Sequence, residues 1–142
     1  MAENDFDLVN NLFCKLVDKK ERKGNSSLAV EEVVVLSIWH ASGIIENGGI
    51  QYFFEQELDA EAVACAYEQI GCDKCAELLR LALSLFPAHI HQAGRSERIK
   101  HVEDNKEIFE KLSSAFWKAD KEMEPQLAEF IRKHLAKSCS SA

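Results

Sequence analysis

The chain has 142 residues, which is enough for one domain whose hydrophobic core needs neither disulfides nor a structural metal. With 46% hydrophobic and 29% charged residues, the composition disfavours disordered, collagen-like and coiled-coil proteins. The 24 acidic residues outnumber the 17 basic ones, and the net charge of −7 disfavours direct nucleic-acid binding, which needs clustered Lys and Arg. Two prolines and six glycines predict long helices with few turns.

The N-terminal part predicts two helices. Apolar residues at helical spacing predict the first helix over residues 5–20, and Gly24-Asn25-Ser26-Ser27 forms the loop that follows. A second helix is expected over residues 29–46. It is apolar on nearly all sides, which is typical of a central buried helix or of a dimer seam. His40 on this helix is expected to be an interior histidine.

Two glycine-containing segments are expected to end helices in the middle of the chain. Asn47-Gly48-Gly49 is expected to end the second helix, because Asn and Gly tolerate the left-handed conformation of a helix C-cap. A short helix then restarts at Ile50. Asp59 is expected to be the N-cap of the next helix, which Gly71 ends. The buried face of that helix is predicted to consist of Val63, Ala66, Tyr67 and Ile70.

The C-terminal half predicts three more elements. Asp73 is expected to cap a helix that ends near Pro87, and residues 87–98 are expected to form a long loop. A helix with an apolar face follows, and Pro125 suits the first turn of the last helix. The last two helices are predicted to bury Ile108, Phe109, Leu112, Ala115, Phe116, Leu127, Phe130, Ile131 and Leu135. The prediction is one all-α domain over residues 1–142, with about six or seven helices and a frayed tail at 138–142.

One run of residues resembles a known signature. An apolar helix containing Trp39 is followed by Glu46-Asn47-Gly48-Gly49-Ile50-Gln51-Tyr52-Phe53-Phe54, which is similar to the signature of the bacterial DNA-mimic protein family. The resemblance covers residues 28–135 and continues in Ile70-Gly71, Phe86-Pro87, Phe116-Trp117 and Arg132-Lys133-His134. The residues taken as the fold signature are Trp39, Asn47, Gly48, Gly49, Phe53 and Phe54.

The resemblance implies an all-α protein without enzyme activity. The characterised member of that family is an acidic dimer that imitates duplex DNA and occupies the DNA-binding surface of a transcription factor. The resemblance therefore implies that this chain binds a basic DNA-binding protein, regulates transcription and forms a homodimer. No cofactor, direct nucleic-acid contact or membrane contact is expected.

The negative charge is concentrated in the middle of the chain. Residues 31–79 contain ten acidic residues and one base, Lys74, for a net charge of −9, whereas the rest of the chain carries +2. Such asymmetry favours a partner chosen by charge, although a solvated acidic surface would produce it too. The predicted partner-binding residues are Glu46, Glu55, Glu57, Asp59, Glu61, Glu68, Asp73 and Glu77.

The helical positions of these acids permit phosphate-like spacing. Glu61 and Glu68 lie on one side of a helix, about 10 Å apart, and Asp73 and Glu77 lie about 6 Å apart. Phosphates of one DNA strand advance about 3.4 Å along the axis per nucleotide, so these carboxylates match alternate or adjacent phosphates. Acids also favour helix N-termini, which is a simpler role for Asp59, Glu61 and Asp73.

Two alternatives remain open at this stage. Cys72-Asp73-Lys74-Cys75 is a C-x-x-C motif at a helix start, which would suit a thiol-based redox sensor or enzyme, although Cys is also a good buried residue. The other alternative is a fold-only domain whose acids serve solubility. No metal site is predicted, because a zinc site needs a second ligand pair and the histidines at 89, 91 and 101 lack carboxylate spacing.

The expected localisation is cytoplasmic. The acidic segment Met1-Ala2-Glu3-Asn4-Asp5 does not resemble a secretory signal. The longest apolar run, residues 33–45, has 13 residues, fewer than the roughly 20 that a membrane span needs. Five cysteines without framework spacing are consistent with reduced thiols.

Overall fold

The computed structural model describes residues 3–87 and 94–136, and every regular element within those ranges is helical. The predicted all-α class is thereby confirmed. In chain order the α-helices are α1 (Asp5–Lys23), α2 (Val30–Glu55), α3 (Ala60–Gln69), α4 (Asp73–Ser84), α5 (Arg95–Asp104), α6 (Lys106–Ala119) and α7 (Met123–His134). Two 3-10 turns, η1 (Asn25–Ser27) and η3 (Asp120–Glu122), precede α2 and α7.

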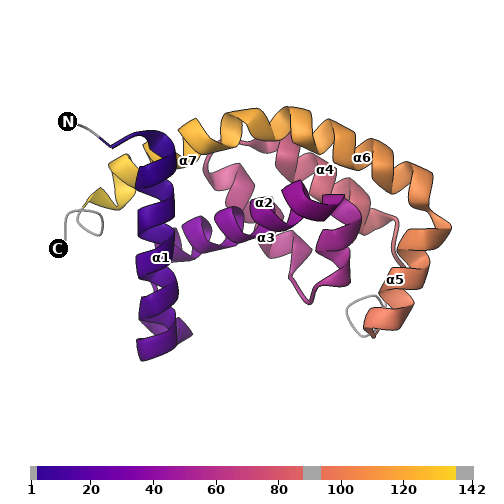
Figure 1. The fold of residues 1–142 in the computed structure, drawn as a ribbon, viewed down its shortest axis with the longest axis horizontal. Helices are drawn as coiled ribbons and strands as arrows, with labels where there is room; N and C mark the ends of the chain where they lie inside the picture. The colour runs from indigo at the N-terminus through magenta and orange to yellow at the C-terminus, as the bar shows by residue number, and fades with distance from the viewer. Residues whose placement is uncertain (1–2, 88–93, 137–142) are drawn as a thin grey trace.

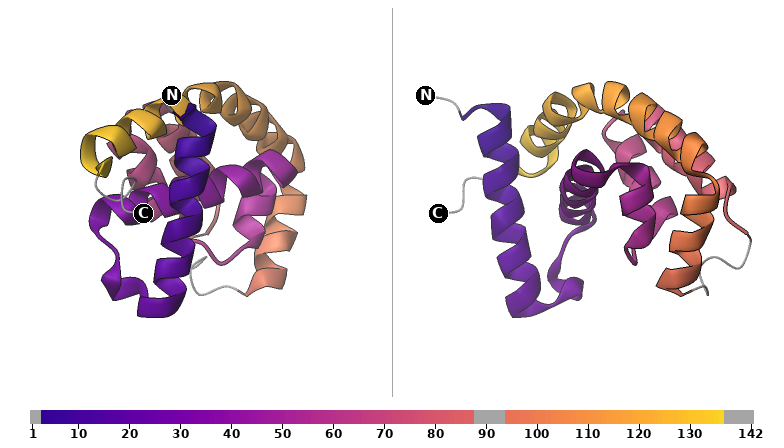
Figure 2. Two further views of the ribbon diagram at one scale, coloured as in Figure 1. Left: turned by 60° about the vertical axis from the view of Figure 1, so that its left-hand side comes forward. Right: turned by 45° about the vertical axis from the view of Figure 1, so that its right-hand side comes forward.

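Helix α2 is the element around which the others pack. It contacts α1, α3, α5, α6 and α7. Figure 1 shows α6, η3 and α7 as a continuous arc over the molecule, with α1 across one end and α5 at the other. The two further views in Figure 2 show the same arrangement. By length and hydropathy α2 is able to cross a membrane. Here its apolar side chains Val35, Ile38, Ile45, Ile50 and Phe53 are fully buried among the other helices.

The helix end expected at Asn47-Gly48-Gly49 is observed as a kink at Gly49, where two helical segments meet within α2 and the second begins at Ile50. Helix α2 continues to Glu55, and only Gly49 leaves the helical conformation, with φ 78° and ψ −179°. The kink frees the backbone N–H of Ile50, which donates to Ser113 Oγ of α6 at 2.8 Å. Ser113 in turn donates to Gln51 Oε1 at 2.9 Å. A hydroxyl from a distant helix thus satisfies the donor that the kink exposes.

The ends of α1, α3 and α4 test four further predictions. Helix α1 extends to Lys23, beyond the expected end at residue 20. Asp59 is the N-cap of α3 as predicted, because its carboxylate accepts the N–H of Ala62 at 3.1 Å. Gly71 ends α3 with φ 87°, and the N–H of Cys72 reaches back to Tyr67 O at 2.9 Å. The capping role of Asp73 was wrong. Cys72 occupies the N-cap and Asp73 is the first helical residue.

The predicted buried faces are largely confirmed. Four predicted residues of α3 and its end, Val63, Ala66, Tyr67 and Ile70, are buried. In α6 and α7 all the predicted apolar residues are buried or half-buried except Ile108, which is 45% exposed. Pro125 lies in the first turn of α7 as expected. His40 is exposed, so the prediction of an interior histidine was wrong.

Helix α5 was not predicted. It begins at Arg95, inside the segment expected to be a loop, and Val102 is its one buried side chain. With so little apolar surface the helix has weak periodicity, which explains why the sequence did not reveal it. The rest of the expected loop, residues 88–93, and the expected frayed tail, residues 138–142, lie outside the described residues.

Candidate functional site

The eight predicted partner-binding acids are spread over four consecutive parts of the chain. Glu46 and Glu55 lie on α2, and Glu57 and Asp59 lie in the connection to α3. Glu61 and Glu68 lie on α3, and Asp73 and Glu77 lie on α4. Seven are exposed and Glu55 is half-buried. All eight carboxylates therefore reach the surface.

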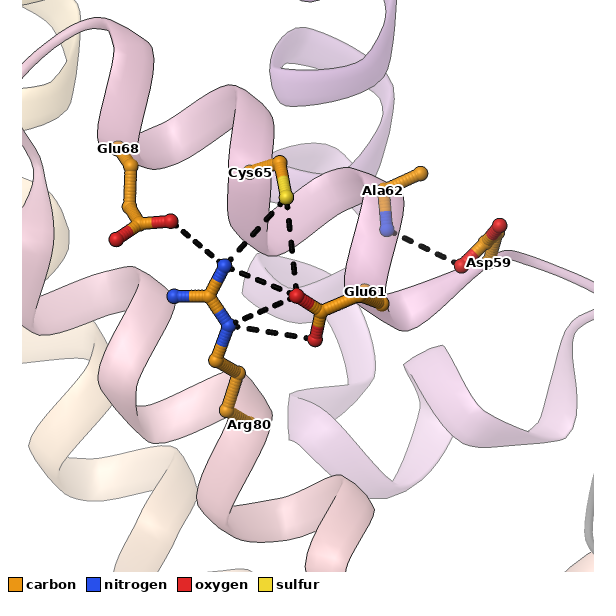
Figure 3. Close-up of polar contacts among 6 residues, drawn as sticks. All are labelled: Asp59, Glu61, Ala62, Cys65, Glu68 and Arg80. Atoms are coloured by element: carbon orange, nitrogen blue, oxygen red, sulfur yellow. Dashed lines mark hydrogen bonds and ion pairs between the residues drawn. The ribbon is translucent and has the colours of Figure 1, made fainter.

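Two of these acids form ion pairs with the same arginine. Arg80 of α4 contacts Glu68 Oε1 through Nη2 at 2.6 Å and Glu61 Oε1 through the same nitrogen at 3.0 Å. Its Nε also donates to Glu61 Oε1 at 3.1 Å (Figure 3). The hydrogen bond from Arg80 lowers the pKa of Glu68, and both carboxylates raise the pKa of Arg80. Glu61 and Glu68 lie on one side of α3 as predicted, but that side faces a cation.

Fewer carboxylates of the acidic middle are unpaired than its count of ten acids indicated. Arg80 lies one residue beyond the segment that was counted, residues 31–79. Lys19 of α1 contacts Glu32 at 2.9 Å, and Lys74 contacts Glu77 at 3.5 Å. Four of the ten acids in the segment consequently have a cationic partner.

Glu46, Glu55, Glu57 and Asp73 have no ion pair within residues 3–87 and 94–136. Asp59 likewise has no cationic partner in the described part of the chain, although its carboxylate caps α3. Two of these acids, Glu46 and Asp59, also lie in different clefts. Glu46 lines a cleft beside η3 and α7, whereas Asp59 lines a groove of about 830 Å³ between α1, α2 and α3. Glu46 and Asp59 thus do not share a single hollow.

A buried polar network that the sequence did not reveal lies under this surface. Asp120 of η3 is 9% exposed and Ser42 of α2 is 2% exposed. The Ser42 hydroxyl lies 2.6 Å from the hydroxyl of Tyr67 and donates to Asp120 Oδ1 across 3.5 Å, the outer limit for such a bond. Burial raises the pKa of Tyr67 above its usual value, so this hydroxyl stays protonated.

Asp120 supplies the carboxylate of this network, and its pKa is raised. Burial, with a smaller contribution from the nearby Glu46 carboxylate, raises the pKa of Asp120 to about 7 against the opposing effect of the Ser42 hydroxyl. In the sequence Asp120 looks like any surface acid between two helices. Its burial depends on how α6, η3 and α7 curve over α2, which no local pattern encodes.

The two cysteines of the C-x-x-C motif are packed inside the protein. Cys72 is 6% exposed and Cys75 is 1% exposed. The Cys72 thiol donates to Gln126 Oε1 at 2.7 Å. Burial, with a further contribution from Asp120, raises the pKa of Cys72 to about 12 and that of Cys75 well above its ordinary value. Reactive thiols require a lowered pKa, so the structure argues against the redox alternative.

We predict that Cys72 and Cys75 resist alkylation in the folded protein. At pH 8 iodoacetamide should modify exposed Cys14 within minutes and the two buried thiols at least about 100-fold more slowly, because the thiolate is the nucleophile. Peptide mass spectrometry gives the rate at each cysteine. Unfolding in urea should make the rates equal. Modification of Cys72 or Cys75 as fast as that of Cys14 without urea would restore the redox hypothesis.

No group of three or more His, Cys, Asp or Glu suitable for a metal occurs among the residues that the structure describes. His101 Nε2 lies 2.6 Å from the carbonyl oxygen of Leu85. The histidines at positions 89 and 91 lie outside the described residues.

The family signature and the structure agree with a comparison to known families. Residues 26–134 match the model of the DMP19-like protein family, in which DMP19 stands for DNA-mimic protein 19. No curated protein and no solved structure matches the chain significantly. The family match covers more than half of the chain, so the protein belongs to the DMP19-like family, and the resemblance seen in the sequence is confirmed. Membership suggests a DNA-mimic protein.

Proposed function

We propose that this protein is a non-enzymatic DNA mimic that uses unpaired surface carboxylates to bind the DNA-contacting surface of a basic DNA-binding protein, such as a transcription factor. Membership of the DMP19-like family is the observation that carries the proposal. The buried, protonated thiols of Cys72 and Cys75 support a binding protein over a thiol enzyme.

The carboxylates that suit this role are those that no cation neutralises. Glu46, Glu55 and Glu57 follow one another through the second half of α2 and the start of its connection to α3. None of them forms an ion pair within the described part of the chain. Their charge is therefore available to attract Lys and Arg of a partner at long range. Glu61 and Glu68, bound by Arg80, are secondary contributors.

We predict that the triple substitution Glu46→Gln, Glu55→Gln and Glu57→Gln weakens binding of the basic partner at least about tenfold at low salt. Removal of three charges lowers both electrostatic attraction and contact energy. The partner would first be captured from cells of the source species at about 50 mM salt and identified by mass spectrometry. Its affinity for the wild-type chain and each variant would then be measured calorimetrically. Duplex DNA should displace the wild-type protein from the partner.

A control variant that loses the same number of charges tests whether binding depends on this particular surface or only on the net negative charge of the protein. The substitutions Glu103→Gln, Glu107→Gln and Glu129→Gln also remove three exposed carboxylates, from α5, α6 and α7, that form no ion pair with the residues the structure describes. This control should change the affinity less than about threefold. Equal losses in both triple variants would show that only net charge matters. Binding that duplex DNA fails to displace would contradict DNA mimicry.

The homodimer and the cytoplasmic localisation remain predictions. Exposed apolar side chains offer a surface for a second copy, among them Val30 and Val33 of α2, which are 69% and 45% exposed. Sedimentation at several protein concentrations tests the dimer.

A further inference from the structure

A cleft of about 410 Å³ lies where α1, α2, η3 and α7 meet. Its volume is within the usual range for ligand pockets. The residues that line it come from all four elements and include Phe6, Trp39, Ser42, Glu46, Asp120 and Glu124. Three of these are carboxylates, Glu46, Asp120 and Glu124.

The buried wall of the cleft contains a carboxylate without a cation. Asp120 is 9% exposed, and the one hydrogen bond that its carboxylate forms with the described residues is the 3.5 Å contact with Ser42. A buried ionised carboxylate normally has a cation or several short donors, since its desolvation is otherwise uncompensated. The structure provides neither among residues 3–87 and 94–136. The Asp120 carboxylate can therefore accept hydrogen bonds from a donor that another molecule supplies.

The other walls suit a positively charged donor. Glu46 and Glu124 form no ion pair within the part of the chain that is described, and Lys121 forms none with the carboxylates of the cleft. The rings of Phe6 and Trp39 line the cleft with their centroids 5.7 Å apart and their planes tilted by 58°. Trp39 is held by its Nε1–H, which donates to Asn10 Oδ1 at 3.2 Å. Aromatic faces beside carboxylates attract cations, and arginine most often.

We propose that this cleft receives the guanidinium group of an arginine side chain, supplied by the basic partner of the proposed function. Asp120 and Glu46 accept its N–H donors, and the Trp39 ring packs on its planar face. A metal ion is a poorer occupant, because no suitable group of three ligands is present among the described residues. A lysine ammonium is a poorer occupant too, because it has neither a planar face to stack on the Trp39 ring nor a fork of N–H donors to bind a carboxylate at two points. The identity of the partner rests on the proposed function, whereas binding of a guanidinium does not.

The test uses the full chain and a small probe, Nα-acetyl-arginine methylamide, followed by two-dimensional ¹H–¹⁵N NMR. Saturable shifts are expected at the indole N–H of Trp39 and at the backbone N–H of Gly43, with the lysine analogue weaker by at least about threefold. Asp120→Asn should weaken binding at least about tenfold, and Glu46→Gln should weaken it less. Glu129→Gln, on an exposed site of α7 outside the cleft, is the control and should leave it unchanged.

The outcomes separate this proposal from the proposed function. Loss of probe binding in a folded Asp120→Asn chain, with weaker partner binding, supports both. If the probe does not bind, or binds Asp120→Asn as tightly as the wild type, the guanidinium cleft is wrong even where duplex DNA still displaces the partner. Equal binding of the arginine and lysine analogues would also overturn it. Probe binding that depends on Asp120 while no DNA-binding partner exists would support the cleft and contradict only the mimic function.

Discussion

Gly49→Ala is expected to lower the free energy of unfolding by about 3 kcal/mol or more. Gly49 has φ 78° and ψ −179°, a region of backbone conformation that is essentially restricted to glycine. A Cβ there would lie 2.6 Å from Gln51 Oε1 and 2.8 Å from Ser113 Oγ. Displacing Ser113 would leave the buried N–H of Ile50 without its acceptor, which adds the cost of an unsatisfied donor. Urea denaturation followed by circular dichroism measures the loss.

Gly43→Ala is the matched control on the same helix. A Cβ at Gly43 meets no atom within 4 Å, and its backbone has no positive φ. Alanine there should stabilise α2 by up to about 1 kcal/mol, as in an ordinary helix interior. If Gly49→Ala were as mild as Gly43→Ala, the kink at Gly49 would not be required by the fold, and the explanation of the signature glycines would be wrong.

Much of the fold was predictable because its signals are local. The apolar stripes of α3, α6 and α7, the cap at Asp59 and the glycine at position 71 each act within one or two helical turns. The signature Asn47-Gly48-Gly49 also predicted a backbone change at the right place. It did not reveal the hydrogen bond from the Ile50 N–H at this kink to Ser113 of α6, because the two residues lie 63 positions apart in the sequence.

The candidate site was harder to predict because its charges depend on packing between helices. A count of charges along the chain treats Glu61 and Glu68 as free, but the tight turn at Gly71 folds α4 back along α3. Glu61 lies ten residues before Gly71 and Arg80 nine after it, so an antiparallel helix pair places them level. This nearly equal separation from Gly71 could have predicted that Arg80 contacts Glu61. The burial of Asp120 had no comparable signal, because η3 is positioned by the arc of α6 and α7.

Asp120→Asn is expected to stabilise the protein by about 4 kcal/mol above pH 7. The folded pKa of Asp120 is about 7 and its ordinary value is 3.8, so the folded state binds the proton more tightly than the unfolded state. No penalty exists below the unfolded pKa, where both states are protonated. Stability is lost as the pH rises from about 4 to 7, and the loss is constant above that range. Asparagine has a similar shape and no charge, so the variant should not show this loss of stability as the pH rises.

The measurement is the difference in free energy of unfolding between Asp120→Asn and wild type from pH 4 to pH 8. The difference should shrink toward zero near pH 4 and reach its plateau above pH 7. Because both chains share all other carboxylates, the subtraction removes their contributions to the pH dependence. Glu122→Gln, an exposed acid in the same turn, should show no such profile. A flat difference would mean that Asp120 is not a destabilised carboxylate. If the variant is more stable yet no longer binds the arginine probe, then the cost of burying this charge serves recognition rather than folding.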